Sequence, residues 1–272
     1  MPGPPLHRVR RLSYSALALY ERCSYRFYAE RIIGLSPAEG RGRVDGHEGL
    51  AATEIGDAVH VLLEQVDLAA PRAPEGDELA TAVRNLYPAA TDDEIERIGR
   101  FVASYCESEV AARVGSLDGA QVEVPFAFEQ DGVLLHGRLD VLHRAGGRAF
   151  VLDYKTNSLV EGTPEEIVEH DYGLQRLVYA LACFRAGADE VEVVYHFLER
   201  PDAVVTRTFT PEEAPALEAE LSSAIAAIHE GAFRPTPSEF VCADCPALDV
   251  VCAGPRLRGA AAAPVPAGAA AG

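Results

Sequence analysis

The sequence predicts a mixed α/β protein in which one central sheet is flanked by helices. Two observations predict it. Apolar and polar residues alternate, with many β-branched residues, between positions 122 and 155 and again between 191 and 210. Before, between and after these stretches, apolar residues recur at helical spacing. The expected order of elements is therefore several helices, three strands, a helix, two strands and a final helix. This order is typical of helices packed on a sheet.

The first part of the chain is expected to be helical. A helix begins at Ser13 or Ser15, both good N-cap residues, and ends before Gly34 and Pro37. Further helices are expected at about residues 54–68, 79–86 and 93–114.

The middle of the chain is expected to form the sheet. VEVPFAF, VLLHGRLDVLHR and AFVLDYK are predicted strands, separated by turns at Asp131-Gly132 and Gly146-Gly147. A helix at about 164–186 follows, and VEVVYHFLER and AVVTRTFT are two more strands. Thr210 caps a last helix that ends at Gly231.

These elements predict one domain with short flanking segments. Residues 1–11 are expected to be a flexible N-terminal segment, and the Ala-rich stretch 256–272 a disordered tail. Residues 12–255 form the domain, and its expected parts are a mainly helical region (12–120), a catalytic sheet and helix (121–209), and a C-terminal helix with a cysteine cluster (210–255).

The charge is strongly acidic and unevenly distributed. The formal net charge of −18 argues against a free-standing nucleic-acid binder held by phosphate neutralisation. Residues 1–44 carry eight Arg and three Glu, a net of +5, whereas the remainder carries 16 basic and 39 acidic groups, a net of −23. If the ligand is DNA, the N-terminal segment, with Arg22 and Arg26, is the best candidate for contacts with its backbone.

The cysteines indicate a metal site. No apolar run approaches the ~20 residues of a membrane span, and the N-terminus lacks a signal-peptide core, so we expect a cytoplasmic protein with few disulfides. Cys242, Cys245 and Cys252 lie on one short segment, one thiolate short of a zinc site or an iron–sulfur cluster. Cys23 is the best fourth ligand, because Cys106 and Cys183 lie in apolar helical patterns typical of core residues.

Two carboxylates and the only lysine of the chain are predicted to converge in the sheet. Asp140 ends one predicted strand, and Asp153 and Lys155 lie on the next, where period-2 geometry puts them on the same face. Such oxygens suit Mg²⁺ or Mn²⁺, which activates water and polarises a phosphoryl group, while the ammonium stabilises the transition state. The alternative is a salt bridge at the strand edge.

Three further residues are candidates for the same site. His60 shares a helix face with Glu64 and becomes a metal ligand only if its helix packs against the strand ends; otherwise it is a packed or surface histidine. Gln175 and Tyr179 lie one turn apart, a pair that on its own is more often a hydrogen-bonded helix surface than a site. Glu123, on another predicted strand, has no assigned role.

Five segments in order resemble RecB-like PD-(D/E)XK nucleases, from Leu12 to about Pro255. They are LSYSALALYERCSYRFYAERIIGL, GDAVHVLLE, GRLDVLHR with VLDYKTN, YGLQRLVYAL and CADCPALDVVC. The chain is similar to the nuclease domains at the C-termini of UvrD-type and AddAB-type helicases, and to CRISPR-adaptation nucleases with an iron–sulfur clasp. Cys23-Ser24 departs mildly from the Cys-Pro of many relatives.

The resemblance implies a fold and roles for the residues. It implies a restriction-endonuclease-like core with a helical insertion and a metal-cluster clasp that joins the N- and C-terminal segments. It implies that Asp140, Asp153 and Lys155 are catalytic, supported by Gln175 and Tyr179, which also contact DNA. The implied metal ligands are His60, Asp140, Asp153 and the Tyr154 carbonyl, and the implied [4Fe–4S] ligands are Cys23, Cys242, Cys245 and Cys252, with zinc as the alternative.

The implied activity is Mg²⁺- or Mn²⁺-dependent hydrolysis of DNA, on single strands or at ends, in repair or recombination. No GxxxxGK[ST] phosphate-binding loop occurs, so we expect a stand-alone nuclease, a split subunit or an excised domain without its own helicase motor. The acidic surface favours a helicase or recombination partner that delivers the DNA. The alternatives are a catalytically silent DNA-binding scaffold of a helicase complex and a zinc-clasped interaction subunit.

Overall fold

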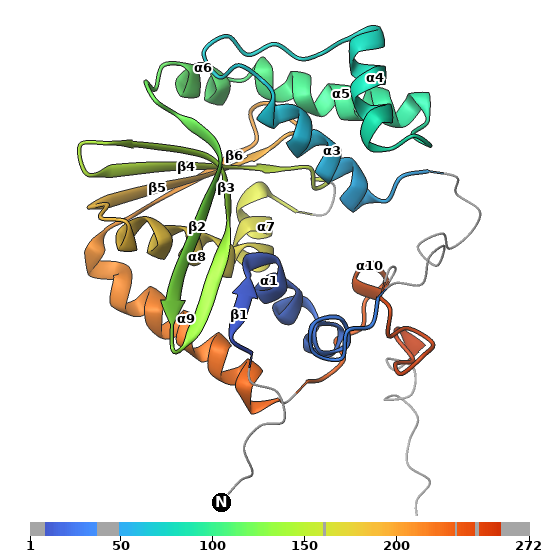
Figure 1. The fold of residues 1–272 in the computed structure, drawn as a ribbon, viewed down its shortest axis with the longest axis vertical. Coiled ribbons are helices and arrows are strands. Elements are labelled where there is room, and N and C mark those ends of the chain that lie inside the picture. The colour runs from blue at the N-terminus through green and yellow to red at the C-terminus, as the bar shows by residue number, and fades with distance from the viewer. Residues whose placement is uncertain (1–8, 37–48, 160–161, 232, 243–244, 257–272) are drawn as a thin grey trace, which may run out of the picture.

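Six strands form one mixed sheet, in the order β1-β3-β4-β5-β6 with β2 also paired to β3. The computed structural model describes residues 9–36, 49–159, 162–231, 233–242 and 245–256 (Figure 1). The strands are β1 (Arg11–Ser13), β2 (Gln121–Gln130), β3 (Val133–Ala145), β4 (Arg148–Lys155), β5 (Glu190–Phe197) and β6 (Val204–Phe209). All five predicted strands are present, and the α/β class is confirmed.

The sheet forks along β3, and this fork positions the site. One edge of β3 pairs with β2 along its length, from Gln121↔Leu142 to Gln130↔Val133. The other edge pairs with β4 only from Val141 onward and with β1 only at residues 134–136. Within the described part of the chain, residues 137–140 therefore have no strand partner on that edge. Asp140 lies at the point where β3 leaves β4.

Helices cover both faces of the sheet. One face packs against α1 (Tyr14–Arg22), α8 (Gly173–Arg185) and α9 (Ala214–Glu230) in the larger apolar core. The other face packs against a second core, built by α3 (Ala52–Glu64), α4 (Gly76–Leu86), α5 (Asp92–Cys106) and α6 (Glu109–Gly115). Figure 1 shows the second group above the sheet and α9 below it. β4 lies between the layers, and all its residues after Arg148 are buried, which explains its nearly continuous apolar sequence.

The predicted helices are present, but the first one and the one expected at 164–186 are each interrupted by a residue with extended or irregular backbone. Ser13 caps α1 as predicted, but Cys23 (φ −158°, ψ 100°) then separates α1 from α2 (Ser24–Phe27), which continues into one π-helical turn, η1 (Tyr28–Ile32). Tyr172 (φ −127°, ψ 14°) separates α7 (Pro164–Asp171) from α8. Both residues make tertiary contacts at these breaks, Cys23 through its sulfur and Tyr172 through its ring and hydroxyl.

The remaining elements follow the expected order. Ser108 caps α6 and so divides the helix expected at 93–114. A 3₁₀ turn, η2 (Pro211–Glu213), precedes α9, and Gly231 ends α9 in the left-handed conformation (φ 71°). A short helix, α10 (Glu239–Cys242), leads into the cysteine segment. No described helix is both long and apolar enough to span a membrane. Most of the expected flexible segment (1–8) and of the expected disordered tail (257–272) lies outside the described residues.

Candidate active site

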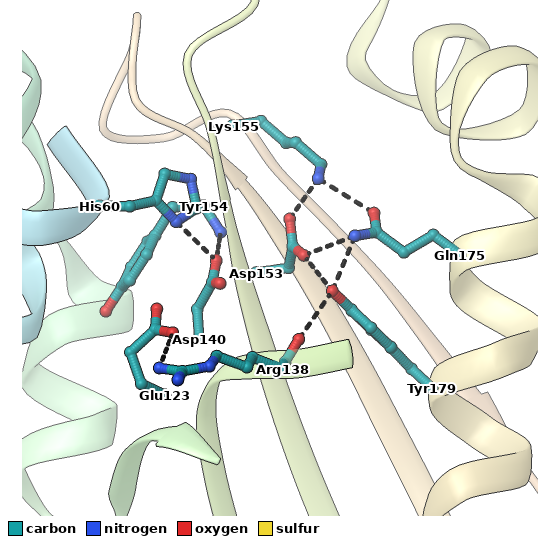
Figure 2. Close-up of polar contacts among 9 residues, drawn as sticks. All are labelled: His60, Glu123, Arg138, Asp140, Asp153, Tyr154, Lys155, Gln175 and Tyr179. Carbon is teal, nitrogen blue, oxygen red and sulfur yellow. Dashed lines mark hydrogen bonds and ion pairs between the residues drawn. The ribbon is translucent and has the colours of Figure 1, made fainter. Parts of the chain in front are cut away.

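His60, Asp140 and Glu123 converge where the sheet forks (Figure 2). The ligand atoms of these three side chains all lie within 4.8 Å of one another. His60 Nδ1 is 3.4 Å from Asp140 Oδ2, and the same oxygen accepts a hydrogen bond from the Tyr154 backbone N–H at 2.8 Å. β4 has no backbone partner on the β3 side at Tyr154, because its pairing with β3 ends at Leu152. The Asp140 carboxylate accepts the hydrogen bond from the Tyr154 N–H that a strand carbonyl would otherwise accept.

Helix α3 brings His60 to the strand ends, which is the condition for its expected role. A Cβ at Gly56 would lie only 3.2 Å from Thr156 Oγ1, so the glycine allows α3 to approach the chain just after β4. The rings of His60 and Tyr154 meet edge to face, 5.9 Å apart. Helix α3 therefore packs where the histidine can reach Asp140.

Glu123 is a site residue to which the sequence assigned no role. Its neighbours on β2 pair with Val141 and Leu139, so Glu123 lies opposite Asp140 in the register. Its backbone has φ +51°, an uncommon conformation for a residue other than glycine. Counting residues away from the Asp131-Gly132 turn along both strands of the hairpin places Glu123 opposite Asp140, so the sequence could have indicated this pair. No sequence signal indicates the unusual backbone conformation of Glu123.

Asp153 and Lys155 form the other half of the site, with Gln175 and Tyr179 of α8. The Lys155 ammonium forms an ion pair with Asp153 Oδ1 and donates to Gln175 Oε1 at 3.0 Å. Gln175 Nε2 and the Tyr179 hydroxyl donate to Asp153 Oδ2 at 2.9 and 2.8 Å. All four side chains are buried, and Figure 2 shows them on the α8 side of Asp140. Gln175 and Tyr179 therefore hold Asp153 and Lys155 in place and are not a helix surface.

Aromatic rings enclose the lysine. Its Nζ lies 4.0 Å from the centroid of the Tyr172 ring and 5.4 Å from that of Tyr195. Burial alone would lower the pKa of Lys155, but the adjacent Asp153 carboxylate raises it above its ordinary value. Lys155 is thus held as an ammonium.

The electrostatics of His60 depend on Asp140. Burial alone would lower the pKa of His60, but the Asp140 carboxylate outweighs that effect and raises the pKa of His60 to about 9. Without a cation, His60 is therefore protonated and paired with Asp140, and a metal ion would have to displace its proton.

The residues at the fork have the chemistry of a divalent cation site. Two carboxylates and an imidazole suit Mg²⁺ or Mn²⁺. Asp153 Oδ1 is buried and paired with the Lys155 ammonium, so a cation would have to share this oxygen with the lysine. Of the expected ligands, His60 and Asp140 lie together in the structure, and Glu123 is a third possible ligand beside them. Asp153 is engaged with Lys155, Gln175 and Tyr179, and its metal role stays a prediction, as does that of the Tyr154 carbonyl.

The cysteine segment lies against the start of the chain. The Ser24 hydroxyl donates to the Arg234 carbonyl at 3.0 Å, and the Tyr25 hydroxyl donates to the Val251 carbonyl at 3.3 Å. Arg26 donates to the Val241 carbonyl at 2.7 Å and pairs with Glu30 at 2.6 Å. The predicted contact between the two ends is therefore present, and Arg26 is part of it. Arg22, the other predicted DNA contact, is half-buried at the end of α1.

The comparisons with known proteins decide the family. The family model of the PD-(D/E)XK nuclease superfamily matches residues 11–252. The chain belongs to this superfamily. The restriction-endonuclease-like fold expected from the sequence is thereby confirmed, and the superfamily implies a nuclease that hydrolyses phosphodiester bonds.

Individual relatives are more distant. The chain is 26% identical over 172 residues to an ATP-dependent helicase/nuclease subunit of Bacillus cereus (strain ATCC 10987 / NRS 248), in a match that covers 54% of this chain and 14% of that protein. It thus spans about one seventh of that relative. A candidate exonuclease from Eubacterium rectale is 13% identical, with a TM-score of 0.46 and 85% of each chain covered. The SSO0001 crystal structure is 17% identical, with a TM-score of 0.36, and the match covers 88% of this chain and 96% of that one.

Changing Glu123 to glutamine should weaken Mn²⁺ binding to this nuclease by about 10- to 100-fold, in the range seen when groups around a metal are altered. The amide keeps the shape of the side chain but removes one of the two negative charges that face His60. Titration calorimetry with Mn²⁺ measures the effect. Glu129→Gln, on the same strand but six residues away, is the matched control. Equal Mn²⁺ affinities for the Glu123 variant and wild type would remove Glu123 from the site.

Proposed function

We propose that this chain is a Mg²⁺- or Mn²⁺-dependent deoxyribonuclease that cleaves single strands or DNA ends, in repair or recombination, together with a helicase partner. One observation carries the proposal. At the fork of β3 and β4, His60, Asp140 and Glu123 meet on one side, while Asp153 and Lys155 are held rigidly on the other. A packed core requires neither a buried ammonium nor this many carboxylates at one point.

Each residue has a task that its contacts support. His60, Glu123 and Asp140, with Asp153 across the fork, would hold the cation, which lowers the pKa of a bound water and polarises the phosphoryl group. Lys155 would direct its ammonium toward the charge that develops on the phosphate oxygens. Gln175 donates to Asp153 and accepts from Lys155, and so fixes the distance between the carboxylate and the ammonium. Tyr179 fixes Asp153 from the other side.

The test is cleavage of end-labelled oligonucleotides by the purified chain with Mn²⁺, Mg²⁺ or EDTA. We expect single-stranded DNA to be cleaved with either metal and to remain intact in EDTA. RNA of the same sequence tests the specificity for DNA, and circular single-stranded DNA tests the need for an end. Cleavage that persists in EDTA, or no cleavage of any of these substrates, would contradict the proposal.

A [4Fe–4S] cluster held by Cys23, Cys242, Cys245 and Cys252 is the second part of the proposal. None of the four forms a disulfide. Backbone N–H groups of Arg26 and Thr236 point at Cys23 Sγ, each at 3.4 Å, and that of Gly254 points at Cys252 Sγ at 3.4 Å. Such bonds favour thiolates.

Replacing Cys23 with serine should cost on the order of 4 kcal/mol of stability, because the link between the two ends of the chain is lost. For a domain of this size, the melting temperature should fall by about 10 °C. Iron content, visible absorbance and thermal melting of anaerobically purified protein measure the effect. Cys106→Ser, a half-buried cysteine of α5, is the control. Unchanged melting with full iron content would exclude Cys23 as a ligand, and zinc in place of iron would change the identity of the clasp.

The helicase partner is proposed from the relative. A protein named as a helicase/nuclease subunit contains a segment similar to this chain. The acidic surface of this chain, with a formal net charge of −18, makes delivery of DNA by a partner physically reasonable. Stimulation of cleavage by a helicase bound to the same DNA would support it.

A further inference from the structure

The forked sheet leaves one of its faces open beside the active site. On β3, Val133, Leu135 and Leu139 are buried, whereas Leu134, His136 and Arg138 point the opposite way, toward Asp140's side of the sheet. The exposed fraction is 36% for Leu134 and 65% for the Arg138 side chain. This row of side chains ends at the fork.

The neighbouring strands continue the same face. The register pairs Pro125 and Ala127 of β2 with Arg138 and His136, and Arg11 and Ser13 of β1 with Leu134 and His136. Each of these partners is exposed or half-exposed. We call this surface the open face, and its residues are Arg11, Ser13, Pro125, Ala127, Glu129, Leu134, His136 and Arg138, since exposed Glu129 of β2 pairs with Leu134.

The helices account for why the face is open. The opposite side of β1, β2 and the first half of β3 packs on α1, α8 and α9, through residues such as Leu12 and Leu135. The second core of helices α3–α6 reaches the sheet at Val122 and Val141 and along β4, but contains no residue of β1. Within the described part of the chain, the open face is therefore covered by neither layer, as Figure 1 also indicates.

The open face carries two arginines and one carboxylate, that of Glu129, on an acidic protein. Arg11 is exposed and has no carboxylate partner among the described residues. Among the described residues, the Arg138 side chain forms one ion pair, with Glu123 at 3.4 Å, and is largely exposed. Pro125, Ala127 and Leu134 present small or apolar surface near them. Guanidinium groups that contact phosphates are typical of surfaces that bind single-stranded nucleic acid.

We infer that a single nucleic-acid strand lies along the open face and enters the active site at Asp140, with its phosphates on Arg11 and Arg138. This inference rests on the proposed nuclease function and names where its substrate binds. Leu134, beside Arg11, and Arg138 are four residues apart, or about 13 Å along the strand. The face is three strands wide, about 10 Å between its outer strands, which suits one extended chain.

The test is the affinity of metal-free protein for a fluorescein-labelled 16-nucleotide oligo(dT), measured by anisotropy in EDTA at several salt concentrations. Arg11→Gln and Arg138→Gln should each weaken binding about 3- to 10-fold. Each should also reduce the slope of log K against log salt by about 0.7, the value for one phosphate contact on a single strand. Arg148→Gln, an exposed arginine paired with Glu190 beside the β3–β4 turn, is the control and should bind like wild type.

A photo-crosslinking residue at position 127 gives a second, charge-neutral measurement. Ala127 lies on the open face, and Thr208 is an equally exposed position on β6. The oligonucleotide should crosslink at 127 and not at 208. Absence of wild-type binding, unchanged affinity in both arginine variants, or equal crosslinking at the two positions would overturn the inference. Because binding is measured without metal, a chain that binds here without cleaving would contradict the proposed function alone.

Discussion

Replacing Asp140 with asparagine is expected to lower the rate of DNA cleavage by about 10³-fold or more. The carboxylate pairs with His60 and faces Glu123, so its charge is central to cation binding. An asparagine oxygen can still accept the Tyr154 N–H bond, which preserves the fork. Single-turnover cleavage of labelled oligonucleotide measures the loss, and circular dichroism checks the fold.

Asp131→Asn provides the matched control for this change. Asp131 is an exposed residue of the β2–β3 turn with φ +52°, a conformation that asparagine tolerates well. This variant should cleave at the wild-type rate. If Asp140→Asn also retained a rate within twofold of wild type, the fork would not be the catalytic centre.

Replacing Lys155 with methionine is expected to lower kcat by about 10²- to 10³-fold, the size of effect seen when one transition-state charge stabiliser is lost. The apolar side chain fits among Tyr172 and Tyr195 but carries no ammonium. Mn²⁺ affinity should change much less, because Lys155 is not among the three clustered ligands. Parallel measurement of kcat and of Mn²⁺ binding separates the two effects.

The single variant also leaves the Asp153 carboxylate buried without its counter-ion, which should cost about 3–5 kcal/mol of stability. The double variant Asp153→Asn/Lys155→Met removes both charges and should recover much of that stability without recovering activity. Wild-type kcat in a folded Lys155→Met protein would refute the catalytic role. Recovery of cleavage in the double variant would make the lysine a structural partner only.

The local pattern of the sequence predicts five of the six described strands and brings Asp153 and Lys155 together, because period-2 alternation and short turns determine them. Asp140, expected at the end of a strand, lies inside β3. The fork itself is not predictable in this way. It depends on the three residues of β1 pairing with β3 more than a hundred positions away. Such non-local pairing has no periodic signal, so β1 falls at the end of a segment expected to be flexible.

The interruptions of the helices have the same origin. Cys23 breaks α1 from α2 while its sulfur accepts backbone hydrogen bonds from both ends of the chain. Tyr172 breaks α7 from α8 where its ring covers Lys155 and its hydroxyl donates to Asn157 at 2.7 Å. In both places tertiary contacts outweigh local helix propensity. Cys23 and Tyr172, which interrupt helices, and Glu123, which has a positive φ, all lie at the candidate sites. In this protein, departures from regular backbone therefore coincide with the candidate functional residues.

The position of the cation tests the central claim most directly. A crystal soaked in Mn²⁺ and measured at the manganese absorption edge should give an anomalous peak between His60, Glu123 and Asp140, about 2.0–2.3 Å from their ligand atoms. Such a peak would establish the fork of β3 and β4 as the metal centre of this nuclease. A well-occupied peak elsewhere, with none beside Asp140, would contradict the account.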